Sequence, residues 1–307
     1  MTEPSTQVTR LFGGPGSGKT TALLDRVERL LDEEEDVEFR DVLVVSYTRA
    51  AAAEIRERLA ERGLTAQPED EALEGTDIVI LAVPDELIGP ITDDVVPKVD
   101  DGTMIVLLDP AAAYADVLHE SEEVSYFLTH PCHPSFFTAE TDMDDENPDW
   151  FGGQGRDPQD IVCALHQGPD EEYAKGEAIA RDMYGPVRNA HRVTTEQMAL
   201  LEPALVETLL GTCLYVIRDG YERVVEMGVP EEAARQFLFG HLRIELGIVF
   251  EYTDFPFSEG AQQAIEEAKP KIFQPDWEDR VFELSSVQDS VEAIADPDCF
   301  SVVGGGD

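Results

Sequence analysis

The chain has 307 residues, 42% of them hydrophobic, and a formal net charge of −43 that comes from 65 acidic against 22 basic residues. This length and apolar content allow a substantial core, which excludes a disordered protein and suits two domains. Concentrated salt screens the self-repulsion of such a charge, so the composition indicates adaptation to a high-salt cytoplasm. Because clustered basic residues are lacking, nucleic acid is not expected as a partner.

The pattern contains no export, membrane or disulfide signal. The opening MTEPSTQ has neither a basic nor an apolar leader, and we read no apolar run as approaching the roughly 20 residues that cross a bilayer. The four cysteines are scattered without a CxxC pair. Reduced thiols are therefore predicted, with neither a disulfide framework nor a cysteine zinc site. We expect a cytoplasmic protein without a membrane partner.

Residues 13–20 read GGPGSGKT and stand between an apolar strand at 8–12 and a predicted helix that runs to about 32. The pattern G-x-x-x-x-G-K-[ST] in this context predicts a phosphate-binding loop for ATP with Mg²⁺. Its backbone amides would face the phosphates, the lysine would add a point charge and the threonine hydroxyl would bind Mg²⁺. The residues assigned to this site are Gly13, Gly16, Gly18, Lys19 and Thr20. The alternative is a glycine turn that binds nothing.

Over about the first sixty residues, this loop and the later VVSYTRAAAAEIRERL resemble the start of UvrD/Rep-like superfamily 1 DNA helicases. The resemblance implies ATP binding. A complete motor also needs an acidic strand end, a glutamate that positions water, and arginines from a second motor domain. The nearest candidate, Asp85-Glu86, follows an apolar run that Pro84 interrupts. Helicase activity is therefore not expected.

From about residue 63, apolar strands alternate with helices. Strands are predicted at 76–85, 102–110, 125–134, 160–168 and 186–193, a helix at 86–99, and a long loop or lid at 136–158. This alternation predicts an α/β fold with a Rossmann-like, mostly parallel sheet.

From Thr194 onward the pattern becomes helical, which predicts an all-helical carboxyl-terminal domain. The first helix is largely apolar and suits a buried central position, with Thr194 or Thr195 as N-cap and Gly228 as its stop. A second helix opens with Pro230, a favoured first-turn residue. The predicted domains are the phosphate-loop βαβ segment at 1–62, the nucleotide-binding domain at 63–193, the helical domain at 194–297 and a frayed tail at 298–307.

A second resemblance covers the larger part of the chain. EGTDIVILAVPDELIGPITDDVVPKVDDGTMIVLLDPAAAY resembles the fourth and fifth strands of Rossmann domains of the 3-hydroxyacid and phosphogluconate dehydrogenase type. Through THPCHP, EPALVETLLGTC and FLFGHLRIELG, residues 63–297 resemble the phosphogluconate dehydrogenase-like family that includes D-apionate oxidoisomerases. The resemblance implies NAD or NADP as cofactor, a sugar-acid or hydroxy-acid substrate, and a homodimer through the helical domain.

Ligands of open α/β sheets lie beyond the carboxyl ends of the strands. Two strand ends therefore indicate one cofactor crevice, formed by Val83, Pro84 and Asp85 after one strand and by Asp109 and Pro110 after the next. The alternative is that both are strand-ending turns, which Pro and Asp favour in any case.

The opening of the chain departs from the dehydrogenase pattern. The resemblance implies a G-x-G-x-x-G loop and an acidic residue for the ribose, but Gly14-x-Gly16-x-Gly18 is too short, and Arg49 follows a strand end that lacks the acid. The phosphate-loop segment occupies this place. A recombined gene that keeps the fold and loses NAD(P) affinity is one open explanation.

The loop that carries His130, Cys132 and His133 follows a predicted strand. Histidine side chains titrate near neutral pH and serve as general bases, so His130 or His133 is a candidate base for a substrate hydroxyl. The alternative is that both are loop histidines held by backbone carbonyls.

Glu202 falls near the place where related 3-hydroxyacid dehydrogenases carry their catalytic lysine, and it is the third catalytic candidate. His241 and Glu245 lie four residues apart and share one helix face. With Glu202 they form a candidate site for a divalent metal, Mg²⁺ or Mn²⁺. The alternative is a buried polar cluster with Arg243 or Arg218.

Three functional hypotheses follow. The first is an NAD(P)-dependent oxidoreductase for a sugar acid or hydroxy acid, with or without an isomerase half-reaction, in which Glu202 or a metal polarises the carbonyl. The second is a P-loop ATP-binding protein. The third is a fusion that keeps its fold but has no activity.

Overall fold

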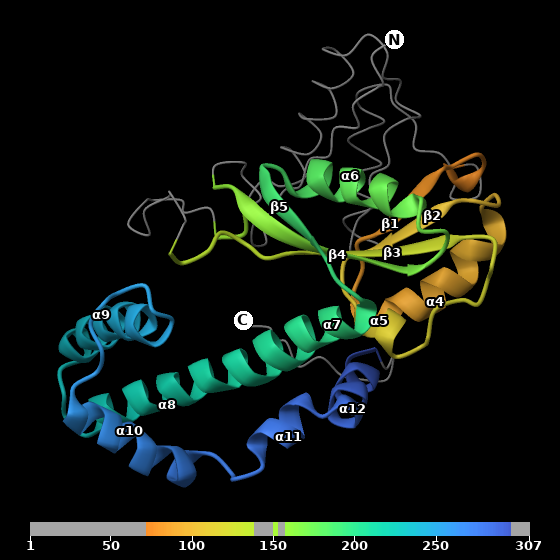
Figure 1. Cartoon of the computed structure of the whole chain (residues 1–307). Helices are drawn as coiled ribbons and strands as arrows, with labels where there is room; N and C mark the ends of the chain where they lie inside the picture. Colours follow the sequence, from red (N-terminus) through yellow and green to blue (C-terminus); the bar gives the residue numbers. More distant parts are fainter. Residues whose placement is uncertain (1–71, 138–149, 153–156, 296–307) are drawn as a thin grey trace, which may run out of the picture. The chain divides into compact units, whose positions relative to one another are not determined.

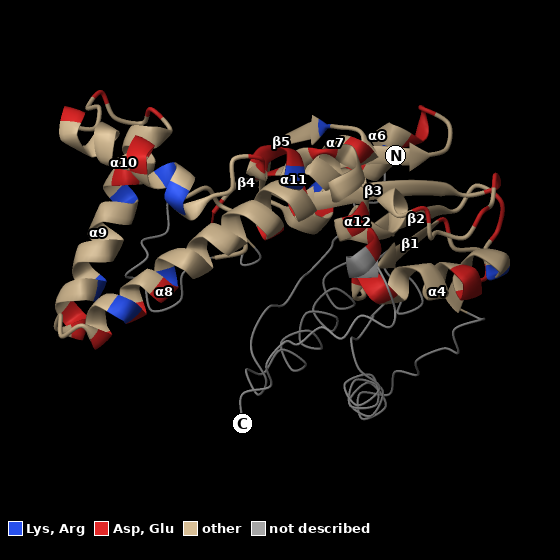
Figure 2. Cartoon of the chain, turned by 90° about the horizontal axis from the view of Figure 1, so that it is seen from below, with Lys and Arg blue, Asp and Glu red and all other residues tan. Residues whose placement is uncertain are grey.

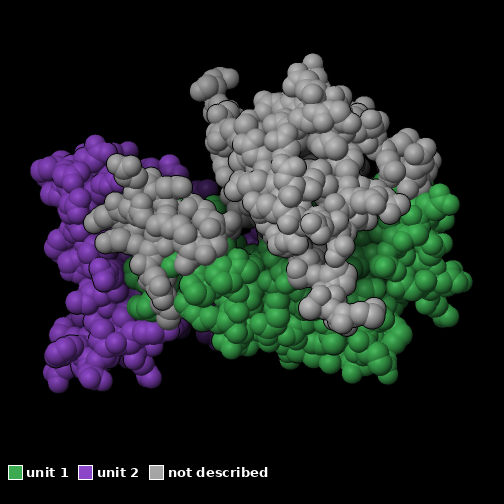
Figure 3. Space-filling model, turned by 90° about the horizontal axis from the view of Figure 1, so that it is seen from above, with its two compact units in different colours: residues 1–199, 291–307 green, residues 200–290 purple. Residues whose placement is uncertain are grey.

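A computed structural model describes residues 72–137, 150–152 and 157–295 of the chain (Figure 1). It divides into two compact units (Figure 3). The first extends up to Ala199 and resumes at Val291, and the second comprises Leu200–Ser290. The boundary falls within one helix, Thr195–Glu226. The phosphate loop, Arg49 and the tail lie outside the described residues.

The first unit contains a five-stranded sheet in the order β1-β2-β3-β4-β5. Its strands are β1 (Ile78–Leu81), β2 (Met104–Leu107), β3 (Ser125–Pro131), β4 (Gln159–Gln167) and β5 (Val187–Arg192). β1, β2 and β3 are parallel, β4 is antiparallel to β3, and β5 is parallel to β4. The predicted mostly parallel, Rossmann-like sheet is confirmed, and so is the helical region that follows it.

Alternate side chains of each strand point to opposite faces of the sheet. Apolar side chains therefore stand on both faces, and helices cover each of them. On one face Leu107 and Leu128 pack with α4 (Asp85–Val95) and α5 (Ala111–Tyr114). On the other face Val106 and Phe127 pack with α6 (Glu172–Tyr184). All four residues of β2 are buried, as the apolar run MIVL requires of a central strand.

A close contact fixes α6 on the sheet. A Cβ atom added at Gly176 would stand 2.3 Å from the Phe127 ring, so only glycine permits this approach. The remaining short element of this unit before β2 is a 3-10 turn, η2 (Val96–Lys98), which continues α4. The sequence predicted the helix after β1 but made no prediction for α6.

The long helix consists of α7 (Thr195–Ala199), a π-helical stretch η3 (Leu200–Gly211) and α8 (Thr212–Glu226). Thr194 and Gln197 form a capping box, in which the Gln197 amide donates to Thr194 Oγ1 at 3.1 Å and the Thr194 amide donates to Gln197 Oε1 at 3.0 Å. Gly228, with a φ of +100°, ends the helix. The predicted N-cap at Thr194 and stop at Gly228 are confirmed.

The predicted burial of this helix is wrong for the single chain. Thr195–Glu226 contains an 18-residue window with a mean hydropathy of 1.6, of which only 11% is buried. By length and composition this one helix could cross a membrane, so the expectation that no apolar run approaches that length is also wrong. Polar residues interrupt the apolar ones along this segment, so its high mean hydropathy is not apparent as a continuous apolar run, and most of the window is exposed in the single chain.

The second unit continues with α9 (Glu231–Val249), α10 (Glu259–Ile272), α11 (Trp277–Phe282) and the start of α12 (Leu284–Ala295). Pro230 is the cap residue that precedes α9, and the Ser258 side chain caps α10. Figure 2 shows acidic residues on helices and loops of both units, with few basic ones, as the composition requires.

Candidate functional site

Three parallel strands end at one edge of the sheet and bring polar residues together there. Asp85 follows β1, Asp109 follows β2 and His130 lies near the end of β3. Leu128 on β3 faces α4 and α5, and His130 stands two positions further along this strand, so its side chain points to the same face. Asp109 follows the end of β2 by two residues. We call Asp85, Asp109 and His130 the strand-end cluster.

Asp109 and His130 are close neighbours in this cluster. A carboxylate oxygen of Asp109 and a ring nitrogen of His130 lie within 4.8 Å of one another. The Ala111 amide donates to Asp109 Oδ1 at 2.8 Å, which holds the carboxylate at the start of α5. Both residues are half-buried. The structure therefore brings the predicted base next to a predicted cofactor-binding residue.

The hydrogen bond of His130 determines which nitrogen can accept a proton. His130 Nδ1 lies 2.8 Å from the carbonyl oxygen of Leu108. A carbonyl oxygen only accepts, so Nδ1 carries the hydrogen and Nε2 carries the lone pair. The backbone contact is thus compatible with both predictions for this histidine, because it orients the ring and leaves a basic nitrogen.

Asp85 has an altered acidity at the start of α4. The pKa of Asp85 is raised from 3.8 to about 7, mainly by burial and in addition by the negative charges of Asp109 and Glu86, against a backbone hydrogen bond and His130, which lower it. A carboxyl group with this pKa holds a proton up to neutral pH and can donate a hydrogen bond. Such values are frequent in ligand-binding crevices.

Val83, Pro84 and Pro110 complete the cofactor crevice predicted from the sequence. Val83 is partly buried against the apolar core beside the strand ends, and Pro84 precedes α4 as its cap residue. Pro110 is buried and precedes α5. Together with the strand-end cluster they offer apolar and carboxyl surface, and none of these six residues is a lysine or arginine. The other cofactor-binding candidates, Gly13, Gly16, Gly18, Lys19 and Thr20, lie outside the described residues.

His133 extends the cluster toward the loop after β3. Its ring centroid lies 6.2 Å from that of His130 and 5.6 Å from that of Phe151, and its Nδ1 lies 3.3 Å from the Phe151 carbonyl oxygen. A φ of +61° at His133 turns the backbone here. The structure therefore brings both histidine candidates together, with Cys132 between them as an exposed thiol.

The second unit carries the remaining candidates. Glu202 lies half-buried on η3, and His241 and Glu245 are exposed on α9. Among the described residues, His241 and Glu245 belong to no group of three side chains whose ligand atoms lie within 4.8 Å of one another. His241 stacks on Phe237 at 4.0 Å and contacts its carbonyl oxygen at 2.7 Å. The metal site stays a prediction that the single chain does not assemble.

The alternative for Glu202, His241 and Glu245 is a buried polar cluster with Arg243 or Arg218, but Arg218 is not buried. Arg218 pairs with Glu222, one turn along the same helix, at 2.9 Å. This pair is exposed and local, so it contributes little to stability.

Two polar residues on the last two strands, β4 and β5, have no place in the sequence-based site. Asp160 on β4 and His191 on β5 lie 2.7 Å apart, between Asp160 Oδ2 and His191 Nε2. Their signal in the sequence is weak, because polar residues in DIVCALHQ and VRNAHR also fit strands with one solvated face. Only the pairing of β4 with β5 brings them together.

Comparisons with known proteins match the chain in two parts. Residues 139–295 match the family model "Phosphogluconate dehydrogenase (decarboxylating) C-term", and residues 1–97 match the model of the UvrD/REP helicase N-terminal domain. The D-apionate oxidoisomerase of Rhizobium rhizogenes is 44% identical over 254 residues, which cover 83% of this chain and 90% of that protein.

A solved structure and a helicase relative complete the comparisons. The crystal structure of a semialdehyde dehydrogenase NAD-binding protein from Cupriavidus necator, in complex with calcium and NAD, has a TM-score of 0.76 and 38% identity. The aligned region covers 90% of this chain and 96% of the Cupriavidus necator chain. An ATP-dependent helicase/nuclease from Clostridium botulinum is 47% identical over 64 residues, which are 20% of this chain and 5% of the helicase.

Proposed function

Because the chain belongs to the D-apionate oxidoisomerase family of NAD-dependent oxidoreductases, we propose that it oxidises a hydroxyl group of D-apionate or a closely similar sugar acid. The observation that carries the proposal is the strand-end cluster, in which the Leu108 carbonyl oxygen orients the His130 ring through Nδ1 and the ring lies beside Asp109. Alcohol oxidation needs a proton acceptor at the substrate hydroxyl, and an oriented imidazole meets that need.

The residues at the strand ends fit one end of NAD better than the other. Val83, Pro84 and Pro110 offer apolar surface, and a protonated Asp85 offers a hydrogen-bond donor. These groups suit the nicotinamide and its ribose, whereas the pyrophosphate needs amides or cations. When bound, the oxidised nicotinamide supplies the hydride acceptor. NAD is preferred over NADP, because the Cupriavidus necator structure holds NAD.

Each residue of the cluster then has a separate role in the proposed oxidation. His130 Nε2 takes the hydroxyl proton as the carbonyl forms, and the Leu108 carbonyl keeps the ring in the required tautomer. Asp109, next to His130, stabilises the imidazolium that results. His133 is the second candidate base. Glu202 is proposed to polarise the carbonyl, either by donating a hydrogen bond from a protonated carboxyl group or by holding a divalent metal, which would act as the Lewis acid.

The test is an assay of NADH formation with D-apionate and NAD in molar KCl, on the full chain. We expect His130→Gln to lower kcat by about 10²–10⁴-fold, the usual effect of losing a general base. His133→Gln and Glu202→Gln are expected to lower it less if their roles are auxiliary. The matched control is His119→Gln, a change in the loop before β3, at the amino ends of the parallel strands. Equal activity of His130→Gln and the wild-type protein would refute the assignment of the base.

A second candidate function is ATP binding at the phosphate loop, favoured by the helicase match over residues 1–97. Titrations with NADH, NADPH and Mg-ATP separate the hypotheses. Fluorescence transfer to bound NADH supports the oxidoreductase, whereas ATP binding that Lys19→Ala abolishes supports the alternative. A folded protein that binds none of the three would be an inactive fusion.

We propose further that a second copy covers the apolar surface of the second unit. Exposed apolar side chains follow η3, α8 and α9, among them Leu205, Leu210, Leu214, Val216, Phe237 and Ile244. Soluble monomers rarely expose contiguous apolar patches of more than a few hundred Å². A homodimer through these helices would bury them, since stable interfaces cover about 800 Å² per partner.

Leu214→Glu tests this proposal by placing a charge in the apolar surface, and light scattering after size exclusion measures the mass. We expect the wild-type protein to be a dimer and the variant a monomer. Gln263→Glu, on α10, adds the same charge at an exposed polar position and should leave the dimer intact. A monomeric wild-type protein that binds lipid vesicles through Thr195–Glu226 would instead indicate a membrane segment.

We propose further that the protein is adapted to a high-salt cytoplasm. With a net charge of −43, the folded chain is expected to gain stability as KCl rises toward molar concentration, because the Debye length falls to about 3 Å at 1 M. Thermal unfolding in KCl from low to molar concentration measures this. An unchanged melting temperature would contradict the proposed high-salt cytoplasm.

A further inference from the structure

An aspartate–histidine pair on β4 and β5 is built like a general base. His191 Nε2 lies 2.7 Å from Asp160 Oδ2, and Asn189 Nδ2 donates to both Asp160 oxygens at 3.2 and 3.3 Å. Partial burial would raise the pKa of Asp160, but its hydrogen bonds from His191 and Asn189 outweigh this and hold it below the ordinary value. Asp160 is therefore a carboxylate at neutral pH.

The partner of Nε2 determines the tautomer of His191. A carboxylate only accepts, so Nε2 carries the hydrogen, and the neutral ring has its lone pair on Nδ1. Among the described residues, no hydrogen bond involves this Nδ1 atom. The side chain of His191 is 53% exposed. A basic nitrogen, oriented by an anion, is thus accessible to a ligand.

The register of the sheet places this pair on the same face as the strand-end cluster. His130 on β3 pairs with Val162 on β4, and Val162 pairs with His191 on β5. Residues paired in this way point to the same face, and neighbouring strands lie about 4.8 Å apart, so His130 and His191 are about 10 Å apart along the row. Val162 and Val193 belong to the core on the α4 and α5 face. A small polyhydroxylated acid on this face can contact both histidines.

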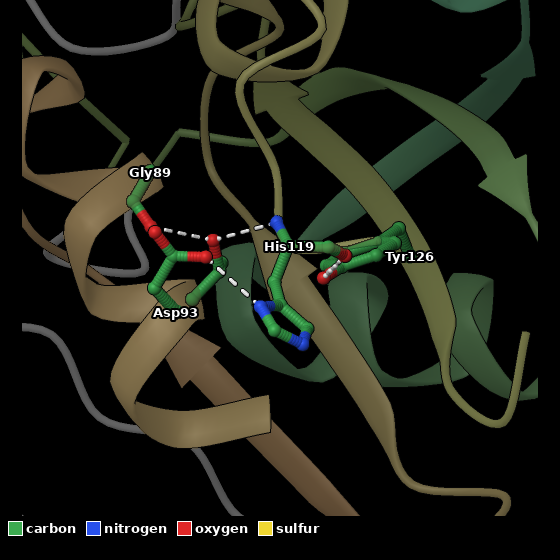
Figure 4. Close-up of polar contacts among 5 residues, drawn as sticks. Gly89, Asp93, His119 and Tyr126 are labelled. Atoms are coloured by element: carbon green, nitrogen blue, oxygen red, sulfur yellow. Dashed lines mark hydrogen bonds and ion pairs between the residues drawn. The ribbon is translucent and has the colours of Figure 1, made fainter. Parts of the chain in front are cut away.

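A second aspartate–histidine pair in the same unit shows what a structural pair looks like (Figure 4). His119 Nδ1 lies 2.9 Å from Asp93 Oδ1, the His119 amide donates to Thr92 Oγ1, and Tyr126 donates its hydroxyl hydrogen to the His119 carbonyl oxygen. This network connects α4, the loop before β3 and β3 itself. It lies at the amino ends of the parallel strands, because α4 runs back from the carboxyl edge.

The Asp160–His191 pair has no comparable structural task. β4 and β5 already pair through their backbones, and exposed ion pairs contribute only about 0–1 kcal/mol to stability. Its position beside the crevice is the feature that distinguishes it from the pair at Asp93.

We propose that His191, oriented by Asp160, is a second acid–base group of the crevice and serves the isomerisation half of the reaction. This rests on the proposed function. Oxidation of an alcohol releases one hydride and one proton, and the proton goes to His130. Isomerisation leaves the formula unchanged, so a proton that leaves one substrate oxygen has to return to another. His191 Nδ1 takes that proton from the hydroxyl beside the new carbonyl, and this oxygen forms a C=O bond as a substituent of its carbon migrates with the bonding electrons to the neighbouring carbonyl carbon. The oxygen of that former carbonyl then receives the proton from Nδ1, while Asp160 stays ionised.

The test separates the two halves of the reaction in the full-length protein. NADH formation reports oxidation, and NMR of the products distinguishes the oxidised sugar acid from its isomer. At saturating D-apionate, we expect His191→Gln to keep kcat for NADH formation within about threefold, to raise the KM for D-apionate, and to lower the yield of isomer by about 10²-fold or more. Asp160→Asn should act in the same direction, and Asp160→Glu should restore part of the isomerisation. His119→Gln and Asp93→Asn are the matched controls and should leave the product ratio unchanged.

A binding measurement keeps the inference independent of turnover. Calorimetry with D-apionate in the presence of NADH should show binding that is weakened about tenfold in His191→Gln, as expected for one lost hydrogen bond, and unchanged in His119→Gln. If the wild-type protein forms no NADH, the proposed function fails, and binding alone decides on His191. Wild-type binding and a wild-type product ratio in His191→Gln would overturn the inference.

Discussion

The sheet unit and the helical unit use apolar residues in opposite ways. In the sheet unit Ile105 and Phe127 are fully buried within one chain. In the helical unit Phe237 and Ile244 remain 69% and 55% exposed. The same residue types therefore form a complete core in one unit and an uncovered surface in the other. The sheet unit thus buries its own apolar residues, whereas the helical unit leaves apolar side chains exposed that the proposed second copy would cover.

The largest effect should come from the same substitution made in both units. Phe127→Ala removes a ring packed between β2, β4 and α6, and we expect it to lower the free energy of unfolding by about 3–5 kcal/mol. Phe237→Ala should change it by no more than about 0.5 kcal/mol in the monomer, since its ring is exposed. Urea unfolding in molar KCl, at protein concentrations below dimerisation, measures both. Equal losses would remove the contrast between the two units.

A smaller effect is expected from Asp85→Asn and depends on pH. The folded protein keeps the Asp85 proton up to about pH 7, whereas the unfolded chain releases it near the ordinary pKa of 3.8. Between these values the folded state binds more protons, so the free energy of unfolding falls as pH rises, and the loss is complete above pH 7. Asparagine carries no charge and avoids this loss.

Melting temperatures of Asp85→Asn and the wild-type protein, at pH 5 and pH 8 in the same salt, test this expectation. At pH 8 the melting temperature of the variant should exceed that of the wild-type protein, by about 2–4 °C for each kcal/mol by which the free energy of unfolding differs. At pH 5 this difference in melting temperature should be smaller. Asp94→Asn, an exposed residue later in α4, is the control and should show no such dependence. A gain of equal size at both pH values would rule out burial of the carboxylate as the cause.

The smallest effect concerns the connection to the long helix. Thr194→Ala removes one half of the capping box, and we expect a loss of about 1 kcal/mol. Thr212→Ala, at an exposed position within the same helix, should be neutral or slightly stabilising because alanine is the better helix former. Thermal unfolding of both variants measures the difference. Equal effects would show that the cap contributes nothing beyond helix propensity.

Much of the fold could be predicted from local patterns in the sequence. The apolar runs around Val79 and Val106 predicted parallel strands, and Thr194 and Gly228 marked both ends of the long helix. The strand ends at Asp85 and Asp109 indicated a crevice, because parallel strands present their carboxyl ends at one edge. These inferences succeeded because each depends on a few neighbouring residues.

Other features needed the tertiary structure. The meeting of Asp160 with His191, and their alignment with His130, depend on strand register, which no single segment encodes. Burial raises the pKa of Asp85 through its surroundings. The long helix looked like a buried element by composition, yet composition does not say whether the same chain or a second copy covers it.

The sequence by itself thus determined where the five strands lie, both ends of the long helix, the charge and the residues available at the strand ends. Only the tertiary structure decided which of these residues meet, which nitrogen of His130 keeps its lone pair and which apolar surface stays exposed. The physical reason is that backbone periodicity and capping are local, whereas register, desolvation and hydrogen-bond partners arise between segments far apart in the chain.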